Sequence, residues 1–331
     1  MHGTQQLQQL RDAFGSKLLE QEPMQRHTNF RVGGPAACYM EARTAEDITR
    51  AVTIAREAGV PWFVLGGGSN TLVGDAGFDG LVIQIALRDI VVDGDRIRAG
   101  AGAITASVAL EAGRAGLSGF EWAISLPGTI GGAARGNAGC FGSEMKDVIE
   151  RVRVLDTGSS PPQTRDMEAA ACDFHYRRSI FKEQPEWIIL DVTLELHRAD
   201  SVLCRVAMDQ FLERRRRTQP HDKPSAGCLF KNVELYALSA DAMDHLERFS
   251  AGTWRGVVHD GQLPVGWIID QLGMKGHRVG NAQISEKHGN FTLNLGGATA
   301  ADVLALGEQV RTSARNALGI DIEYEVQRLG C

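Results

Sequence analysis

Two dense clusters of glycine constrain this chain most strongly, because backbone without side chains can turn tightly or approach a ligand closely. The 331 residues include 38 glycines and only 10 prolines. The first cluster is Gly66-Gly67-Gly68-Ser69-Asn70, directly after a short apolar run at 61–65, and the second lies within 126–142. One tri-glycine is explained equally well as a tight turn without a ligand. Two clusters indicate backbone that faces a bulky ligand, and we expect them to face one another.

The spacing within the first cluster excludes the two common phosphate-binding motifs. It lacks the Gly-x-Gly-x-x-Gly pattern of dinucleotide folds and the Lys-Ser/Thr of a P-loop. Successive backbone N–H groups can still form a nest that binds pyrophosphate oxygens. The small residues of the second cluster suit a flat, extended ring system, so we predict FAD. The predicted cofactor-binding residues are Gly66, Gly67, Gly68, Ser69, Asn70, Pro127, Gly128, Thr129, Gly131, Gly132, Asn137 and Gly139.

Composition narrows the class of protein further. A hydrophobic content of 43% in a chain of this length predicts two domains or one domain with a large extension. The net charge is -6, and the 35 lysines and arginines are dispersed, so we expect no nucleic-acid partner. The N-terminal residues form neither a secretory signal nor a membrane span, which predicts a cytoplasmic protein with no membrane partner. The six scattered cysteines include no Cys-x-x-Cys pair, so we predict free thiols and no metal site.

Hydrophobic periodicity predicts a mixture of helices and strands. A polar, proline-bounded link with an arginine run places a domain boundary near 198–220, and we divide the chain into a helical segment at 1–20, a domain at 21–200 and a domain at 201–331. Helices are expected at 46–58, 104–115, 203–216, 265–272 and 300–318, and strands at 61–65, 81–85, 90–93, 96–99, 152–156, 187–196, 290–295 and 320–326.

Seven segments, taken in order, resemble the motifs of the UDP-N-acetylenolpyruvoylglucosamine reductase (MurB) family. The short Tyr176-Arg177-Arg178-Ser179 segment is similar to the family's second type, which lacks an extra substrate-covering loop. The resemblance implies an α+β fold, with a two-part FAD-binding domain of the vanillyl-alcohol-oxidase (PCMH) type before a C-terminal α+β substrate-binding domain. The seven segments are 27–34, 64–71, 126–142, 176–181, 224–232, 276–290 and 323–330.

The same resemblance implies the reaction. Noncovalent FAD would take a hydride from NADPH and reduce a UDP-sugar enolpyruvyl ether to UDP-N-acetylmuramate. This step belongs to peptidoglycan precursor synthesis, and therefore to cell-wall biogenesis, cell shape and cell division.

Three residues match the catalytic positions of the family. Arg177 would hold the substrate carboxylate and stabilise an enolic intermediate, although a lone arginine is more often a surface ion pair. Glu325 would act on the same intermediate, and its neighbour on that strand face, Glu323, fits an exposed carboxylate. Cys228 stands where the family more often has a proton-donating serine. A thiol is the stronger acid, but a nearby cation would leave a thiolate, and a buried cysteine can be a small apolar side chain.

Predicted substrate contacts are less specific. Tyr176 would position the substrate or the ring, or simply pack. Asn232 suits a sugar or phosphate hydrogen bond, whereas His288 either assists binding or caps a turn. Cations for the UDP diphosphate would come from Arg214, Arg215, Arg216, Arg217, Lys223, Lys231 and Lys275, of which Lys231 is the predicted substrate-binding residue.

The chain departs from the family pattern at Val233, where proline is usual, and at Gln327-Arg328, where an Arg-aromatic pair is common. Neither change removes a predicted catalytic residue. Two other functions stay open at this stage. One is a flavin oxidase of the same fold, in which Cys140 could hold FAD covalently, and the other is a noncatalytic UDP-sugar-binding paralogue.

Overall fold

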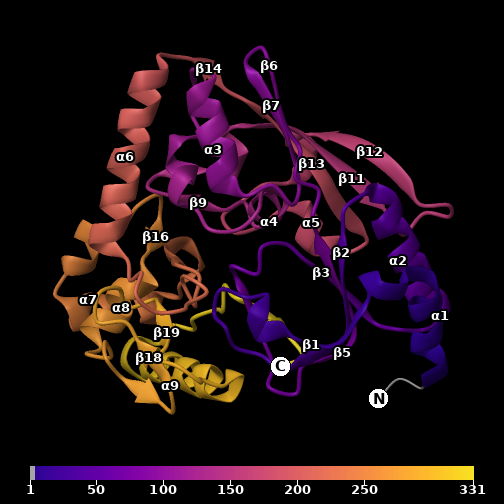
Figure 1. Cartoon of the computed structure of the whole chain (residues 1–331). Coiled ribbons are helices and arrows are strands. Elements are labelled where there is room, and N and C mark those ends of the chain that lie inside the picture. Colours follow the sequence, from indigo (N-terminus) through magenta and orange to yellow (C-terminus); the bar gives the residue numbers. More distant parts are fainter. Residues whose placement is uncertain (1–3) are drawn as a thin grey trace. The chain divides into compact units, whose positions relative to one another are not determined.

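A four-stranded sheet forms the first layer of the fold, in a computed structural model that describes residues 4–331. Its strands lie in the order β1-β2-β5-β3, and β3 runs parallel to β5. Helices α1 and α2 pack against each other beside this sheet (Figure 1). Helix α2 begins where the Thr44 hydroxyl accepts a hydrogen bond from the Asp47 N–H, at 3.0 Å. The bounds are α1 (Thr4–Phe14), β1 (Leu19–Pro23), β2 (Pro35–Ala42), α2 (Ala45–Glu57), β3 (Trp62–Leu65) and β5 (Phe78–Ile85).

A five-stranded antiparallel sheet forms the second layer, in the order β12-β11-β13-β7-β6. Apolar residues of β7, β11 and β13 join one hydrophobic core that also includes β2, β5 and α2. This sheet and its helices comprise β6 (Ile90–Asp93), β7 (Arg96–Gly100), α3 (Thr105–Arg114), α4 (Ile130–Arg135), β11 (Ile149–Asp156), β12 (Gln163–Glu168), α5 (Ile180–Glu183) and β13 (Trp187–Glu195), with the short strands β8 (Leu117–Ser118), β9 (Gly139–Cys140), β10 (Ser143–Glu144) and β14 (His197–Arg198).

Helix α6 (Ser201–Thr218) belongs with these two layers and lies beside α3 (Figure 1). The contact is close, because a Cβ atom at Gly113 would clash with the Met208 Cε. The Phe211 ring also stacks on Phe141, with 5.7 Å between ring centroids. The first compact unit therefore ends at Arg217, within the boundary region predicted at 198–220 but later than residue 200, since these apolar contacts tie the helix to it.

The division of the chain also differs from the expected linear order. The first unit comprises residues 1–22, 36–68 and 79–217, and the second comprises 23–35, 69–78 and 218–331. Two short segments of the N-terminal half therefore belong to the second unit. One of them supplies Asp75, whose carboxylate accepts hydrogen bonds from Ala300 N and Ala301 N at the start of helix α9, at 2.7 and 3.0 Å.

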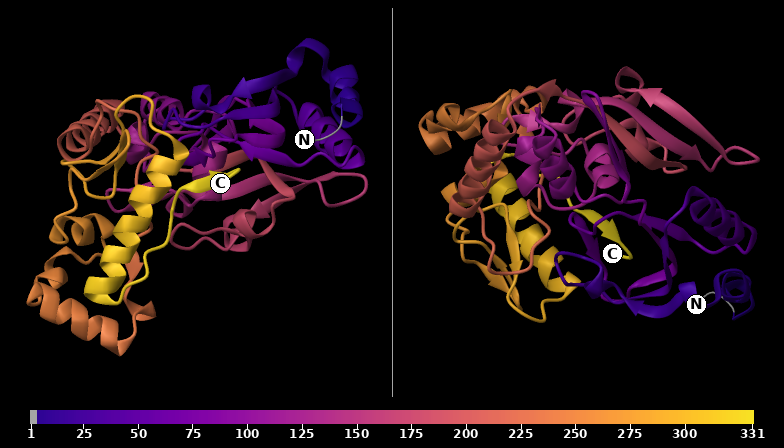
Figure 2. Two further views of the ribbon diagram at one scale, coloured as in Figure 1. Left: turned by 90° about the horizontal axis from the view of Figure 1, so that it is seen from below. Right: turned by 45° about the horizontal axis from the view of Figure 1, so that its top comes forward.

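The second unit is built from short strands and helices around its own core. Helix α9, the long yellow helix of Figure 2, packs against β17 and β18. Strands β17, β18 and β19 form one sheet, β15 pairs with β16, and β4 pairs in parallel with β20. The bounds are β4 (Thr71–Val73), β15 (Val233–Glu234), α7 (Ala240–Ser250), β16 (Gln262–Leu263), α8 (Val265–Gln271), β17 (Arg278–Val279), β18 (Ala282–Ile284), β19 (Thr292–Asn294), α9 (Ala300–Leu318) and β20 (Gln327–Leu329).

The expected helices are confirmed, with α9 over 300–318 as predicted. The expected N-terminal helical segment is α1 followed by a 3-10 turn at Gly15–Lys17, and residues 1–3 lie outside the described part of the chain. The strand predicted at 320–326 is wrong. Only an isolated bridge joins Tyr324 to Phe230, because Glu325 N and Val326 N share one acceptor, Leu229 O, and regular pairing starts at Gln327.

Candidate active site

The two glycine clusters meet in the first unit, as predicted. A Cβ atom at Gly67 would lie 2.9 Å from the Gly128 Cα, and one at Gly66 would lie 2.9 Å from the Thr129 Oγ1. Gln84 Nε2 donates to Gly66 O at 3.2 Å, and the Tyr39 hydroxyl donates to the Gln84 side chain. The approach of the two loops therefore requires glycine, and the half-buried amide of Gln84 fixes the position of one of them.

The buried hydroxyl of Thr129 provides a test of the predicted cofactor. Thr129 is 8% exposed, and among residues 4–331 its Oγ1 has no hydrogen-bond partner. A buried hydroxyl without a partner is costly in a finished protein. Backbone without side chains around an unsatisfied hydroxyl fits a flat, oxygen-rich ligand such as FAD, whose polar atoms would supply the missing partner.

Arg177 lies in a tight turn of the same unit. His175 and Arg178 exchange two backbone hydrogen bonds of 3.1 Å, and Arg177 itself has φ +54°. Its Nη2 donates to Gly139 O at 3.4 Å, and its guanidinium lies over the Tyr176 ring at 5.0 Å. The structure thus brings the predicted catalytic arginine to the second glycine segment, half-buried rather than extended into solvent.

Cys140 lies in that segment and is also half-buried. Its Sγ is 3.7 Å from Trp122 O. Burial raises the pKa of this thiol above its ordinary value, although arginines nearby lower it in part. Because the thiolate is the nucleophile, a raised pKa makes Cys140 a poor group for covalent attachment.

Cys228 and Glu325 come together in the second unit. Cys228 forms an isolated bridge with Phe291, and the next residue, Leu229, accepts a hydrogen bond from Glu325 N at 2.9 Å. Three chain segments that are distant in sequence therefore meet at this point. Cys228 is half-buried, so it is not simply one more apolar residue of the core.

Asn290, which the sequence did not indicate, holds this meeting point. The side chain is 2% exposed, and its Oδ1 accepts from Phe230 N at 3.0 Å while its Nδ2 donates to Phe230 O at 2.8 Å. This paired contact fixes the backbone two residues after Cys228. Asn290 ends a segment that resembles the family, but a single asparagine carries no signal of such a role.

Asn70, at the end of the first glycine cluster, hydrogen-bonds to the chain around Glu325. Its Nδ2 donates to Glu325 O at 3.3 Å, and its backbone carbonyl accepts from Gln327 N at 2.9 Å. The Oδ1 is buried and has no partner among the described residues. Ser69 and Asn70 belong to the second unit, whereas Gly66, Gly67 and Gly68 belong to the first.

The predicted substrate-binding residues of the second unit are Lys231, Asn232 and His288, and each makes a polar contact within that unit. Lys231 Nζ pairs with Glu323 Oε2 at 2.8 Å, and Glu323 is exposed, as expected. Asn232 Oδ1 accepts from Val265 N at 3.3 Å. His288 Nδ1 accepts from Asn290 N at 3.3 Å, and burial lowers the pKa of His288, with Lys275 lowering it further.

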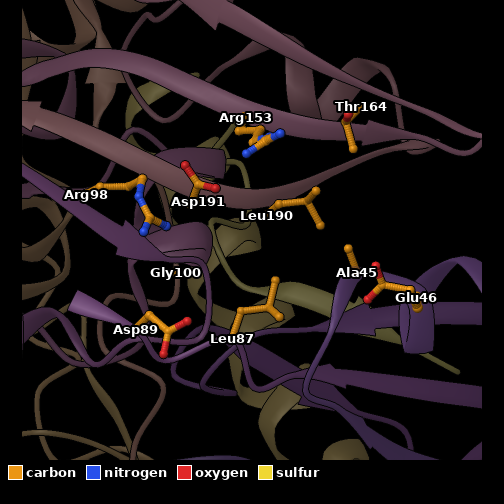
Figure 3. A pocket seen from close by; sticks show the side chains of 10 residues that line it. All are labelled: Ala45, Glu46, Leu87, Asp89, Arg98, Gly100, Arg153, Thr164, Leu190 and Asp191. Carbon is orange, nitrogen blue, oxygen red and sulfur yellow. The ribbon is translucent and has the colours of Figure 1, made fainter. Parts of the chain in front are cut away.

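A cavity of about 310 Å³ lies elsewhere in the first unit, between the start of α2 and the second sheet (Figure 3). It brings together Arg98, Arg153 and the half-buried Asp191, whose pKa is raised mainly by burial. None of its lining residues is a predicted site residue. The lining residues are Ala45, Glu46, Leu87, Asp89, Arg98, Gly100, Arg153, Thr164, Leu190 and Asp191.

Comparison with known families assigns different functions to the two parts of the chain. Residues 36–160 match a model described as an FAD binding domain. Residues 219–329 match a model described as UDP-N-acetylenolpyruvoylglucosamine reductase, C-terminal domain. The chain is therefore a flavoprotein of the oxidoreductase class, with an FAD-binding domain followed by a reductase C-terminal domain.

Whole-chain relatives identify the family. UDP-N-acetylenolpyruvoylglucosamine reductase of Bacillus velezensis is 34% identical over 98% of both chains. The Caldanaerobacter subterraneus reductase is 36% identical over 95% of this chain and 94% of the relative. A crystal structure of the Thermus caldophilus reductase has a TM-score of 0.72 and 32% identity, covering 94% of this chain and 98% of that one. The chain belongs to the UDP-N-acetylenolpyruvoylglucosamine reductase family, and the expected α+β fold is confirmed.

None of the helices in residues 4–331 is both long enough and apolar enough to cross a membrane. The same residues contain no group of three or more His, Cys, Asp or Glu side chains that could hold a metal ion.

Proposed function

We propose that this protein reduces UDP-N-acetylenolpyruvoylglucosamine to UDP-N-acetylmuramate, with noncovalent FAD as cofactor and NADPH as hydride donor. The observation that carries the proposal is the likeness to reductases of this name over 98% of the chain. Because NADPH and UDP-sugars are cytoplasmic metabolites, we place the reaction in the cytoplasm.

Bound FAD would supply the hydride chemistry, since it can accept a hydride from NADPH and pass it to an activated double bond. The protein's residues must hold the flavin, orient the substrate and deliver a proton. The glycine clusters at 66–68 and 126–132, with the unsatisfied Thr129 hydroxyl, would hold the cofactor. The raised pKa of Cys140 supports noncovalent binding.

Arg177 would bind the substrate carboxylate. A planar guanidinium can donate two parallel hydrogen bonds to a carboxylate, and the same bonds strengthen as negative charge develops during hydride addition. Its half-buried position and its link to Gly139 O support this role over a surface ion pair. Tyr176, whose ring lies against the guanidinium, would orient it.

Cys228 would donate the proton. The overall change adds a hydride to one carbon of the enolpyruvyl double bond and a proton to the other, while NADPH becomes NADP⁺. The Cys228 S–H group would provide that proton, and Glu325, held beside Leu229, would stabilise the enol form of the carboxylate before protonation. Lys231, Asn232 and His288 would bind the UDP-sugar.

An anaerobic assay of the purified holoprotein tests this function. We expect NADPH to be consumed beyond one equivalent per flavin only when UDP-N-acetylenolpyruvoylglucosamine is added, and the product to be heavier by two hydrogen atoms. Consumption of NADPH that requires oxygen would instead identify an oxidase. Tight UDP-sugar binding with no NADPH consumption would identify a noncatalytic relative. Release of free yellow flavin on acid precipitation would separately establish noncovalent FAD.

A further inference from the structure

The backbone at Arg177 is in a conformation that an arginine rarely adopts. Its φ of +54° lies in the left-handed region, where a side chain at Cβ crowds the following carbonyl. Such a residue keeps its conformation only when the surrounding structure over-determines it. The turn that carries the proposed substrate-binding arginine must therefore be held by other groups.

Two side chains hold the carbonyls of this turn. Asn137 Nδ2 donates to His175 O at 2.9 Å, and Lys182 Nζ donates to Arg177 O at 2.6 Å. The second contact is a charge-assisted hydrogen bond, which is the stronger kind. Together they fix the backbone immediately before Tyr176 and immediately after the Arg177 Cα.

The Asn137 amide is itself fixed by the protein. The residue is completely buried, its Nδ2 also donates to Glu144 Oε2 at 2.6 Å, and its Oδ1 accepts from Lys146 N at 2.9 Å. A carboxylate only accepts and a backbone N–H only donates, so these neighbours define which end of the amide is nitrogen. Both amide hydrogens are then used within the protein, so the side-chain Nδ2 of Asn137 serves the turn.

A third contact fixes the end of the turn. The buried Ser179 hydroxyl donates to Arg135 O at 2.6 Å, so the chain that leaves the turn is tied to helix α4. The Arg177 guanidinium points to Gly139 O, two residues from Asn137. The turn and the glycine segment are thus linked both through Asn137 and through Arg177 itself.

We propose that Asn137 and Lys182 are positioning residues. By hydrogen-bonding to two carbonyls of the turn, those of His175 and Arg177, they hold Arg177 in the conformation in which it binds substrate. The inference rests on the proposed role of Arg177 in binding the substrate carboxylate. Neither residue is required to touch substrate or flavin. Loss of either grip lets the turn relax toward ordinary backbone and moves the guanidinium, and small displacements of a positioned group have large effects on rate.

Lys182 provides the main test, because Lys182→Met keeps most of the apolar stem and removes only the ammonium donor. In the holoenzyme we expect anaerobic reoxidation of the flavin by UDP-N-acetylenolpyruvoylglucosamine to slow about tenfold or more. Flavin reduction by NADPH should change less than about twofold, since it does not use the substrate carboxylate. Lys182→Arg should restore part of the reoxidation rate, and Lys17→Met, which removes a lysine paired with Asp47, should change neither step.

A double-mutant cycle separates positioning from a general structural role. In an Arg177→Ala background, Lys182→Met should cause little further slowing, because the group that it positions is already gone. Independent, additive effects of the two substitutions would contradict the proposal. Unchanged reoxidation in Lys182→Met, with the wild type active, would also overturn it while leaving the proposed function intact.

Hydrogen exchange at the Arg178 amide gives a readout that does not depend on activity. This amide donates to His175 O, the carbonyl that Asn137 also holds. Exchange there should be faster in Lys182→Met and in Asn137→Ala than in the wild type, with exchange at Phe230 unchanged. Equal exchange in all three proteins would contradict the proposed hydrogen-bond support of the turn, even if the wild type showed no reductase activity.

Discussion

The region around Arg177 and the region around Cys228 achieve the same result by different means. In the first unit a single left-handed turn presents the arginine, and the side chains of Asn137 and Lys182 hold its carbonyls. In the second unit Cys228 forms an isolated bridge with Phe291, and Glu325 N donates to Leu229 O, so three distant segments meet there. One region is a local turn under constraint, and the other is a junction without a regular sheet.

Both regions depend on a buried asparagine, but each for a different reason. Asn137 adds a second hydrogen bond to the turn carbonyl of His175, which also accepts from Arg178 N, and Asn290 replaces the ladder hydrogen bonds that an irregular junction lacks. An amide can donate and accept at once, so it can stand in for a missing backbone neighbour. Arg177 and Cys228 therefore each have a supporting amide that hydrogen-bonds to the backbone two residues away.

The largest expected effect concerns Cys228. Cys228→Ala should slow reoxidation of the flavin by substrate by about 10²–10⁴-fold, because a general acid is removed, and leave reduction by NADPH largely unchanged. Cys228→Ser should recover part of the second step. Rapid-mixing measurements of the two half-reactions check this, and equal slowing of both would argue against a proton donor in the junction.

Asn290→Ala should destabilise the second unit by about 2 kcal/mol or more, because both Phe230 backbone groups would lose their partner in a buried place. Denaturant unfolding gives the free energy of unfolding for the variant and for a matched control, Asn281→Ala, whose asparagine is exposed. The control should change stability by less than about 0.5 kcal/mol. Similar values for both variants would mean that the junction does not need its amide.

Gly67→Ala examines the first unit in the same way. The new Cβ would lie 2.9 Å from Gly128 Cα, a backbone atom that cannot move aside, so we expect a loss of about 1–3 kcal/mol and a lower flavin content. Gly136→Ala is the control, since its nearest contact is an ordinary 3.5 Å. Thermal unfolding and the absorbance of bound flavin check both variants. Full flavin content in Gly67→Ala would show that the two loops have room to separate.

The smallest expected effect is a pH dependence from His288. Because burial lowers its folded-state pKa, the unfolded chain takes up the proton more readily as pH falls below about 6.5. Stability that is present above this pH is therefore lost as pH falls through the folded-state pKa. His288→Gln should reduce that loss when unfolding is measured between about pH 7 and pH 5. An unchanged pH profile would assign the acid sensitivity to other groups.

The two regions also differ in how far the sequence predicted them. The glycine loops, the helix at 300–318 and the strands β3, β5, β6, β7, β11, β13 and β19 follow from local pattern. The meeting of the two clusters was expected because glycine marks close backbone approach. Strand β12 was missed because its residues are polar and largely exposed, and α7 because its short amphipathic pattern was not recognised. The junction at Cys228 could be predicted only through family resemblance, since its segments lie about 60 to 100 residues apart in the sequence.

The positioning contacts were the least predictable part. Lys182 follows the 176–181 segment by one residue, and Asn137 was predicted to contact the cofactor. Their bonds to turn carbonyls depend on where α5 and the loop between α4 and β9 lie in space. A side chain that binds backbone leaves no residue pattern in its partner, because every residue has a carbonyl.

The most direct test of the central claim is the absorbance of the flavin at about 450 nm, followed without oxygen in the purified wild-type protein. We predict bleaching when NADPH is added and recovery when UDP-N-acetylenolpyruvoylglucosamine follows. Recovery that occurs only after oxygen is admitted, or a purified protein that binds no flavin, would contradict the account.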